Sequence, residues 1–360
     1  MPEREETHLR GPVRVIGTGL LGTSVALACR RRGLDVLLSD VAREHVRTAS
    51  GLGAGRPDDG TCPQLVVIAV PPDHLGAAIA AALTEGDAVV TDVGSIKSRP
   101  LAEVRAAVPP AALARYVGSH PMAGSERSGP LAASATLFEG RPWAITAHAE
   151  SDPAAVNLVR ELVDLCGAVP LEYSPDEHDR AVARVSHLPH LMSSLTAGRL
   201  AAAPADHLAL SGQGVRDVTR IAASDPSLWK QIITGNAEAL TELLDDVARR
   251  LAQLREIVTA ADADALAALL AEGVAGTQAI PGKHGGPARP TTGIFVSVPD
   301  HAGELARLFA DAGADGVNIE DVHIDHDPGR PVGLVELVVA AEEAEHLVTS
   351  LTARGWTVHP

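Results

Sequence analysis

The stretch VRVIGTGLLG, residues 13–22, joins an apolar run to an apolar helical sequence through three glycines, Gly17, Gly19 and Gly22. In a strand–turn–helix unit, the first glycine permits the tight turn and the second lets a pyrophosphate approach the backbone. The third allows the helix and the strand to pack closely. Asp40 lies 23 residues after Gly17, at the end of a second apolar run. Together these features predict a Rossmann-like, doubly wound α/β domain that binds a dinucleotide.

The same unit indicates which dinucleotide is bound. Leu20 and Leu21 open the helix, where free N–H groups and a partial positive charge favour phosphate. Asp40 is expected to accept hydrogen bonds from the ribose hydroxyls and to repel a 2′-phosphate, which favours NAD over NADP. Arg43, close by in the sequence, leaves room for use of both cofactors. Val70, at the end of the third apolar run, is expected to border the cofactor.

Composition excludes several classes of protein. The 360 residues are 46% hydrophobic, which is enough for two or three domains with buried cores and excludes a disordered chain. The net charge of −16 and the 2% aromatic content make nucleic acid or membrane an unfavourable partner. Three cysteines without CxxC spacing indicate neither a disulfide framework nor a metal site. The first ten residues lack the apolar core of a targeting segment, so we expect a cytoplasmic protein.

The chain divides by its pattern into four parts. Residues 11–173 alternate apolar runs with helical stretches, and five strands are predicted at 13–17, 35–40, 65–70, 88–94 and 115–120, with a sixth at 143–147 and a helix at 156–167. Apolar residues at three- and four-residue spacing predict an all-helical domain over 174–276. Its apolar faces exceed what one layer can bury, which indicates a homodimer. A Pro- and Gly-rich linker at 277–290 precedes a β-α-β-β-α-β pattern, typical of a ferredoxin-like α+β domain, at 291–360.

Polar residues follow the ends of successive predicted strands, where the ligand crevice of a doubly wound sheet lies. His120 ends the fifth strand and is the candidate general base, because a neutral imidazole can accept a hydroxyl proton while a hydride leaves for NAD. Ser95 follows the fourth strand. Its hydroxyl is placed either to touch nicotinamide or substrate, or to cap the next helix.

The helical domain supplies candidate substrate contacts. Pro189 predicts a local kink, and His190 beside it is favoured as a substrate contact. Arg220 is suited to bind a carboxylate in this acidic chain, and its alternative is a surface ion pair with Asp217. Trp229 is, by its residue type, more often a core residue than a site residue.

Five stretches together resemble the prephenate/arogenate dehydrogenase family of tyrosine biosynthesis. They are GTGLLG (17–22), TDVGSIKS (91–98), GSHPMAGSERSG (118–129), SHLPH (186–190) and RDVTRIAASDPSLW (216–229). The resemblance implies that His120 binds the ring C4 hydroxyl and that Ser95 lies near nicotinamide and substrate. It implies a carboxylate contact for Arg220 in a pocket that His190 also lines. The residues implied around the pocket entrance are Glu126, on a gating loop, Asp217 and Trp229.

Residues 291–360 resemble an ACT domain, which implies a regulatory amino-acid ligand such as tyrosine. The positions implied for that ligand are Asp300, Gly303 and Asn318. His301 and Ala302 depart from the usual pattern of such domains, where Arg or Lys and then Pro are expected.

The resemblance leads to an NAD-dependent prephenate dehydrogenase that forms 4-hydroxyphenylpyruvate. The alternatives are a dehydrogenase of arogenate or of 4-amino-4-deoxyprephenate, which differ from prephenate by one amine. A β-hydroxyacid dehydrogenase would need a catalytic lysine early in the helical domain, and residues 175–200 contain none. A non-enzymatic sensor of NAD or amino acids would not need His120, Ser95 and Arg220 together.

Overall fold

The computed structural model describes residues 8–123, 128–281, 290–314, 316–326 and 332–359. The chain forms two compact units, which divide after Ala252. The domain boundaries expected from the sequence stay predictions.

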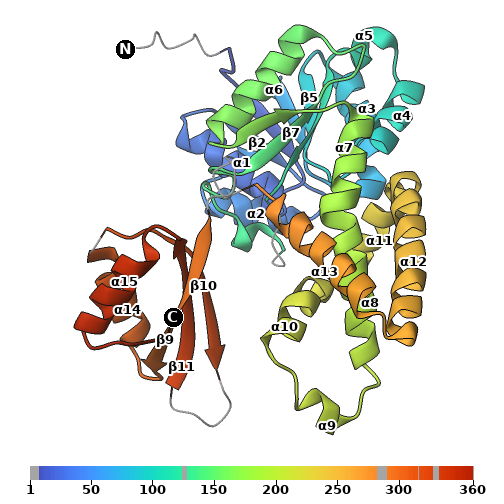
Figure 1. Ribbon diagram of the computed structural model, residues 1–360. Coiled ribbons are helices and arrows are strands. Elements are labelled where there is room, and N and C mark those ends of the chain that lie inside the picture. Colours follow the sequence, from blue (N-terminus) through green and yellow to red (C-terminus); the bar gives the residue numbers. More distant parts are fainter. Residues whose placement is uncertain (1–7, 124–127, 282–289, 315, 327–331, 360) are drawn as a thin grey trace. The chain divides into compact units, whose positions relative to one another are not determined.

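An eight-stranded sheet organises the first unit (Figure 1). Its strands are β1 (Val13–Ile16), β2 (Val36–Ser39), β3 (Arg56–Pro57), β4 (Leu65–Ile68), β5 (Val89–Asp92), β6 (Tyr116–Pro121), β7 (Pro142–Thr146) and β8 (Val169–Glu172). The order is β3-β2-β1-β4-β5-β6-β7-β8, and every neighbouring pair is parallel except β6 and β7. The six strands expected from the sequence are present, and the doubly wound fold is confirmed. β3 and β8 were not predicted.

Helices cover both faces of this sheet. The helices are α1 (Leu20–Arg31), α2 (Arg43–Gly51) and α6 (Pro153–Leu165) on one face, and α3 (Leu75–Glu85), α4 (Ser98–Ala107) and α5 (Pro110–Leu113) on the other. Along β4, Leu65 and Val67 enter the first core, whereas Val66 and Ile68 enter the second. Such a continuously apolar strand is typical of a parallel sheet that is buried on both faces.

Helical elements follow the sheet in the chain. They are α7 (Pro175–Val182), the π-helix η3 (Ala183–His187), α8 (Leu188–Leu200), α9 (Ala205–Leu208), α10 (Gln213–Thr219), the 3-10 turn η4 (Arg220–Ala223), α11 (Pro226–Gly235) and α12 (Ala237–Ala260), which crosses the division between the units. A capping box between Ser174 and Glu177 starts α7. The irregularity expected at Pro189 lies before it, in η3. Pro189 itself stands in the first turn of α8, where no backbone N–H is required.

The second unit contains α13 (Ala263–Gln278) and a four-stranded antiparallel sheet. The elements after α13 are β9 (Thr291–Pro299), α14 (Glu304–Ala314), β10 (Ile319–His326), β11 (Val332–Ala340), α15 (Ala344–Ala353) and β12 (Thr357–His359). The sheet order is β10-β11-β9-β12, and α14 and α15 pack against it in one core. The β-α-β-β-α-β order expected from the sequence is confirmed. Among the described residues, no helix is long and apolar enough to cross a membrane.

Candidate active site

The glycine-rich turn between β1 and α1 has three differently constrained positions. Gly17 has a φ of 98°, and a Cβ there would lie 2.3 Å from the carbonyl oxygen of Ala69. A Cβ on Gly22 would lie 1.9 Å from the carbonyl oxygen of Gly17. At Gly19 a Cβ would meet nothing within 4 Å. Packing alone therefore requires glycine at positions 17 and 22. The open space at Gly19 fits the approach of a ligand to the backbone.

Asp40 ties the end of β2 to this turn. The backbone N–H and the hydroxyl of Thr18 donate to Asp40 Oδ2 at 2.6 and 3.1 Å, and the N–H of Ala42 donates to Oδ1 at 2.8 Å. The first turn of α1, which starts at Leu20 and Leu21, contains no acidic residue that would neutralise its positive end. This arrangement of a free helix N-terminus and a nearby carboxylate suits a dinucleotide.

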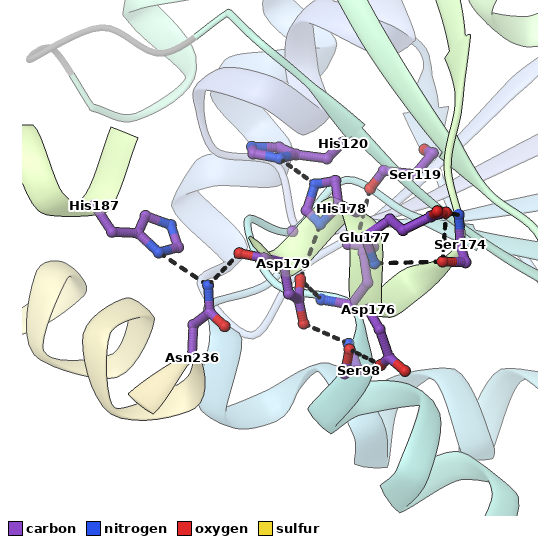
Figure 2. Close-up of polar contacts among 12 residues, drawn as sticks. Ser98, Ser119, His120, Ser174, Asp176, Glu177, His178, Asp179, His187 and Asn236 are labelled. Carbon is purple, nitrogen blue, oxygen red and sulfur yellow. Dashed lines mark hydrogen bonds and ion pairs between the residues drawn. The ribbon is translucent and has the colours of Figure 1, made fainter. Parts of the chain in front are cut away.

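His120 lies at the carboxyl end of β6 and is buried. Its Nδ1 atom is 3.0 Å from Nε2 of His178, and Nδ1 of His178 is 2.9 Å from Oδ1 of Asp179 (Figure 2). Both partners come from α7, on its buried face. The structure thus joins the candidate base to an imidazole and a carboxylate that lie 58 and 59 positions further along the chain.

The carboxylate of Asp179 also holds the start of α4. It accepts hydrogen bonds from the backbone N–H of Lys97 at 2.9 Å and from that of Ser98 at 2.8 Å. Burial alone would raise the pKa of Asp179, but the hydrogen bonds from His178 and Ser98 outweigh burial and lower it. Ser95 does not cap α4, since the helix begins three residues later, at Ser98.

A buried ion pair lies beneath His120. The ammonium group of Lys97 pairs with the carboxylate of Asp92 and donates to the carbonyl oxygen of Ser119 at 2.6 Å. The hydroxyl of Tyr116 donates to the other oxygen of Asp92 at 2.9 Å. These contacts tie the end of β5 to both Tyr116 at the start of β6 and Ser119, the residue before His120.

The histidines of this region have lowered pKa values and are hard to protonate. Burial, together with repulsion from His178 in its charged form, from the ammonium group of Lys97 and from His187 in its charged form, lowers the pKa of His120 well below its usual value. Burial likewise lowers the pKa of His178, and it lowers that of His187 to about 4. At neutral pH these imidazoles are therefore uncharged.

Side-chain contacts continue from Asp179 to the predicted substrate residues. Asn236 Nδ2 donates to the carbonyl oxygen of Asp179 at 2.8 Å and lies 3.2 Å from Nδ1 of His187. The ring of His187 packs edge-on against Trp229, with centroids 6.1 Å apart. Trp229 stacks on His190, with centroids 3.6 Å apart and planes 5° apart. The structure therefore brings His120, His190 and Trp229 into one connected region.

The helix that carries Trp229 lies over the loops that follow β4 and β5. The side chain of Gln231 accepts a hydrogen bond from the N–H of Asp73 at 3.2 Å, shortly after Val70. A Cβ on Gly235 would lie 2.3 Å from Ile96, next to Ser95. This position places α11 at the carboxyl edge of the sheet, where ligands bind in doubly wound folds.

The remaining predicted site residues are less closely connected. Arg220 is exposed at the start of η4, which packs against α8, and it has no ion-pair partner among the described residues. Asp217 accepts a hydrogen bond from Gln213 at 2.8 Å instead of pairing with Arg220. Glu126 lies outside the described residues. No cluster that could hold a metal ion occurs in the part of the chain that the structure describes.

The predicted regulatory positions lie in the second unit. Asp300 and Gly303 are in the turn between β9 and α14, and Gly303 has a φ of 97°. Asn318 immediately precedes β10 and donates to Glu320 at 2.8 Å. Their role in binding an effector stays a prediction.

Two family models match most of the chain. The prephenate dehydrogenase nucleotide-binding domain matches residues 25–172, and the prephenate dehydrogenase dimerization domain matches residues 174–272. The chain belongs to the prephenate dehydrogenase family.

Relatives within this family cover most of the chain. The probable prephenate dehydrogenase NovF of Streptomyces niveus is 35% identical, over 95% of this chain and 98% of that protein. The cyclohexadienyl dehydrogenase of Zymomonas mobilis is 32% identical, over 71% of this chain and 90% of that protein. The prephenate dehydrogenase of A. aeolicus, solved with hydroxyphenyl propionate and NAD+, has a TM-score of 0.67 at 28% identity. This match covers 74% of this chain and 96% of that chain.

Two residues behind His120 carry no recognisable sequence signature. His178 and Asp179 lie among charged neighbours, in the segment SPDEHD (174–179), and show no motif. The available signal was helical phase: both fall on the buried face with Val182 and Ala183. A histidine and an aspartate on the inner face of an amphipathic helix need polar partners, which this phase predicts without saying where they lie.

Proposed function

We propose that this chain catalyses the NAD-dependent oxidative decarboxylation of prephenate to 4-hydroxyphenylpyruvate, in the biosynthesis of tyrosine. The family membership supports the reaction class. The observation that carries the assignment of roles is a buried, neutral imidazole, His120, at the carboxyl end of β6 and on the same sheet edge as the glycine-rich turn.

NAD fits the residues of the turn. Gly19 leaves space at the backbone, the N–H groups of Leu20, Leu21 and Gly22 are available to the pyrophosphate, and Asp40 is placed for the ribose hydroxyls. When bound there, NAD supplies the hydride acceptor. Val70 and Ser95, which follow β4 and β5, would border the nicotinamide end.

The protein residues then have to align the substrate and move one proton. His120 accepts the proton of the C4 hydroxyl as the C4–H bond gives up its hydride. The electron pair of the bond to the ring carboxylate completes the aromatic ring as CO2 leaves, and His120 returns the proton to the phenolate oxygen. Arg220 holds a carboxylate of the substrate, and His190 and Trp229 line the pocket. In the overall reaction, prephenate and NAD+ are converted to 4-hydroxyphenylpyruvate, CO2 and NADH.

The proposal extends to the whole molecule. The chain acts as a homodimer through its helical part, which the dimerization-domain model matches. It works in the cytoplasm, and residues 291–360 bind an amino-acid effector such as tyrosine at Asp300, Gly303 and Asn318. Glu126 and Asp217 border the pocket entrance.

A turnover assay tests the proposal. The full chain is incubated with prephenate, arogenate or 4-amino-4-deoxyprephenate, each with NAD and with NADP, and reduced cofactor is measured by absorbance. We expect the highest kcat/KM for prephenate with NAD, with 4-hydroxyphenylpyruvate as product. A higher kcat/KM for either amino compound would reassign the substrate. Tight NAD binding without turnover of any of the three would contradict the enzymatic role.

A further inference from the structure

The side chains of His120, His178 and Asp179 form a hydrogen-bonded series that ends at the proposed base (Figure 2). We propose that His178 and Asp179 are positioning residues that fix the tautomer of His120, so that Nδ1 carries the proton and Nε2 presents the lone pair to the substrate. This inference rests on the proposed function of His120 as the base.

Asp179 fixes the protons of the whole series, because its backbone neighbours can only donate hydrogen bonds. The N–H of Lys97 points to Oδ1 and the N–H of Ser98 points to Oδ2, and both belong to the positive end of α4. An ionised carboxylate is a pure acceptor and suits such a site best. Nδ1 of His178, 2.9 Å from Oδ1, must therefore carry its proton.

The tautomer of His178 then determines that of His120. A neutral His178 that is protonated at Nδ1 has a lone pair at Nε2. This lone pair lies 3.0 Å from Nδ1 of His120, so Nδ1 of His120 must donate. A neutral His120 is left with its lone pair at Nε2, which has no partner among the described side chains. Burial favours the neutral form of both rings, since it lowers both pKa values.

The same series stabilises the intermediate state of the reaction. When Nε2 of His120 takes the hydroxyl proton, the ring becomes an imidazolium in a buried site, beside the ammonium group of Lys97. The negative charge of Asp179 stabilises this imidazolium through the neutral ring of His178, which lies between them. The proton returns to the phenolate oxygen after CO2 leaves, so the series ends each turnover in its starting state.

Asp179 also has a structural role, because it caps α4. Variants of His178 separate the two roles, since they leave this cap in place. His178→Phe removes the acceptor for Nδ1 of His120. His178→Gln retains an amide oxygen that can accept from it.

The first measurement is the tautomer itself. Nitrogen NMR of the full chain, labelled with 15N-histidine, distinguishes protonated from unprotonated ring nitrogens, and His120→Asn assigns the signals of His120. We expect a protonated Nδ1 and an unprotonated Nε2 in the wild type and in His178→Gln, and a shift toward protonated Nε2 in His178→Phe. A wild-type His120 protonated at Nε2 would overturn the inference, whatever the turnover.

The second measurement is turnover of prephenate with NAD. We expect kcat to fall about 10²-fold in His178→Phe and less than about 10-fold in His178→Gln, with little change in KM, because the loss is confined to proton transfer. Equal and near-normal kcat in the two variants would overturn the inference. If the wild type itself does not turn over prephenate, the proposed function fails, while the NMR result still decides the tautomer.

The variants Asp179→Asn and Asp176→Asn provide a matched pair on α7. Asp176 accepts a hydrogen bond from the Ser98 hydroxyl at 2.8 Å, so it contacts the same residue without reaching the histidines. We expect a loss of kcat of at least about 10²-fold in Asp179→Asn and no loss in Asp176→Asn. Equal kcat values in the two variants would contradict a role of the Asp179 charge.

Discussion

His120 differs from a surface histidine in its burial and in its lowered pKa. It is buried at a strand end, and both this burial and the nearby ammonium group of Lys97 disfavour a second proton on its ring. A base of lowered pKa is weaker, but it is fully unprotonated at neutral pH. The sequence position explains the first property, and the contacts with α7 and Lys97 explain the second.

The lowered pKa of His120 sets the pH dependence of the reaction. The neutral base predominates at any pH above its pKa, so activity is lost only as the pH falls through that lowered value. We therefore expect the acidic limb of kcat/KM to lie below the pH of about 6.5 at which an ordinary histidine titrates. Steady-state kinetics from pH 5 to 8 measure it, and half-maximal activity at or above pH 6.5 would contradict the assignment.

The variant His120→Asn is expected to lower kcat by ~10²–10⁴-fold and to remove the acidic limb of the pH profile.

At this scale the sequence predicts the residues that end strands and misses those that depend on tertiary contact. His120 could be recognised because all parallel strands end at one edge of the sheet. For His178 and Asp179, helical phase predicts at most that they are buried, because the partners that give them a role lie on β6 and at the start of α4. The alternative role of Arg220, a surface ion pair with Asp217, does not form: Asp217 accepts a hydrogen bond from Gln213, one turn earlier on α10.

The elements of the sheet were predictable because most of its strands are apolar on both faces. β8 was missed because its residues are mostly exposed and it contains Pro170. β3 has only two residues, one of them Pro57, and offers no pattern at all. The antiparallel direction of β7 was not predictable either, since period and composition carry no information about strand direction.

The turn before α1 allows folding and cofactor binding to be tested separately. A Cβ on Gly22 would overlap the backbone oxygen of Gly17, which cannot move without opening the turn. We expect Gly22→Ala to lower the free energy of unfolding by about 1–3 kcal/mol or more. Gly19→Ala has open space and should leave stability unchanged, but its methyl group occupies the place of the pyrophosphate, so KM for NAD should rise at least about 10-fold.

Thermal melts and NAD titrations of the two variants check this prediction. If Gly19→Ala bound NAD as tightly as the wild type, the pyrophosphate would not approach the backbone at Gly19. If Gly22→Ala melted at the wild-type temperature, the contact with Gly17 would not constrain the turn.

At the scale of the whole molecule, the acidic surface and the apolar helical faces impose different demands. A net charge of −16 keeps copies of the chain apart at long range, so association needs a specific apolar surface. Exposed apolar side chains of the helical part provide one, and in the first unit they include Leu195, Val218, Leu244 and Leu251. We expect the full chain to sediment as a dimer of twice 37.2 kDa.

Substitution at this surface should separate the copies. Leu251 is 63% exposed, and in a dimer with twofold symmetry each buried side chain occurs twice. At about 1.5–3 kcal/mol for each buried leucine, Leu251→Glu should raise the dimer Kd by ~10²–10⁴-fold. Leu52, at the end of α2 and 44% exposed, provides the control, and Leu52→Glu should leave the mass unchanged. Sedimentation across a range of concentrations measures both, and a monomeric wild type or a dimeric Leu251→Glu would contradict this interface. Because His187, His190 and Trp229 lie on helices of the same part, the dissociated variant should also lose affinity for prephenate, and an unchanged KM would show that the dimer does not hold these helices in place.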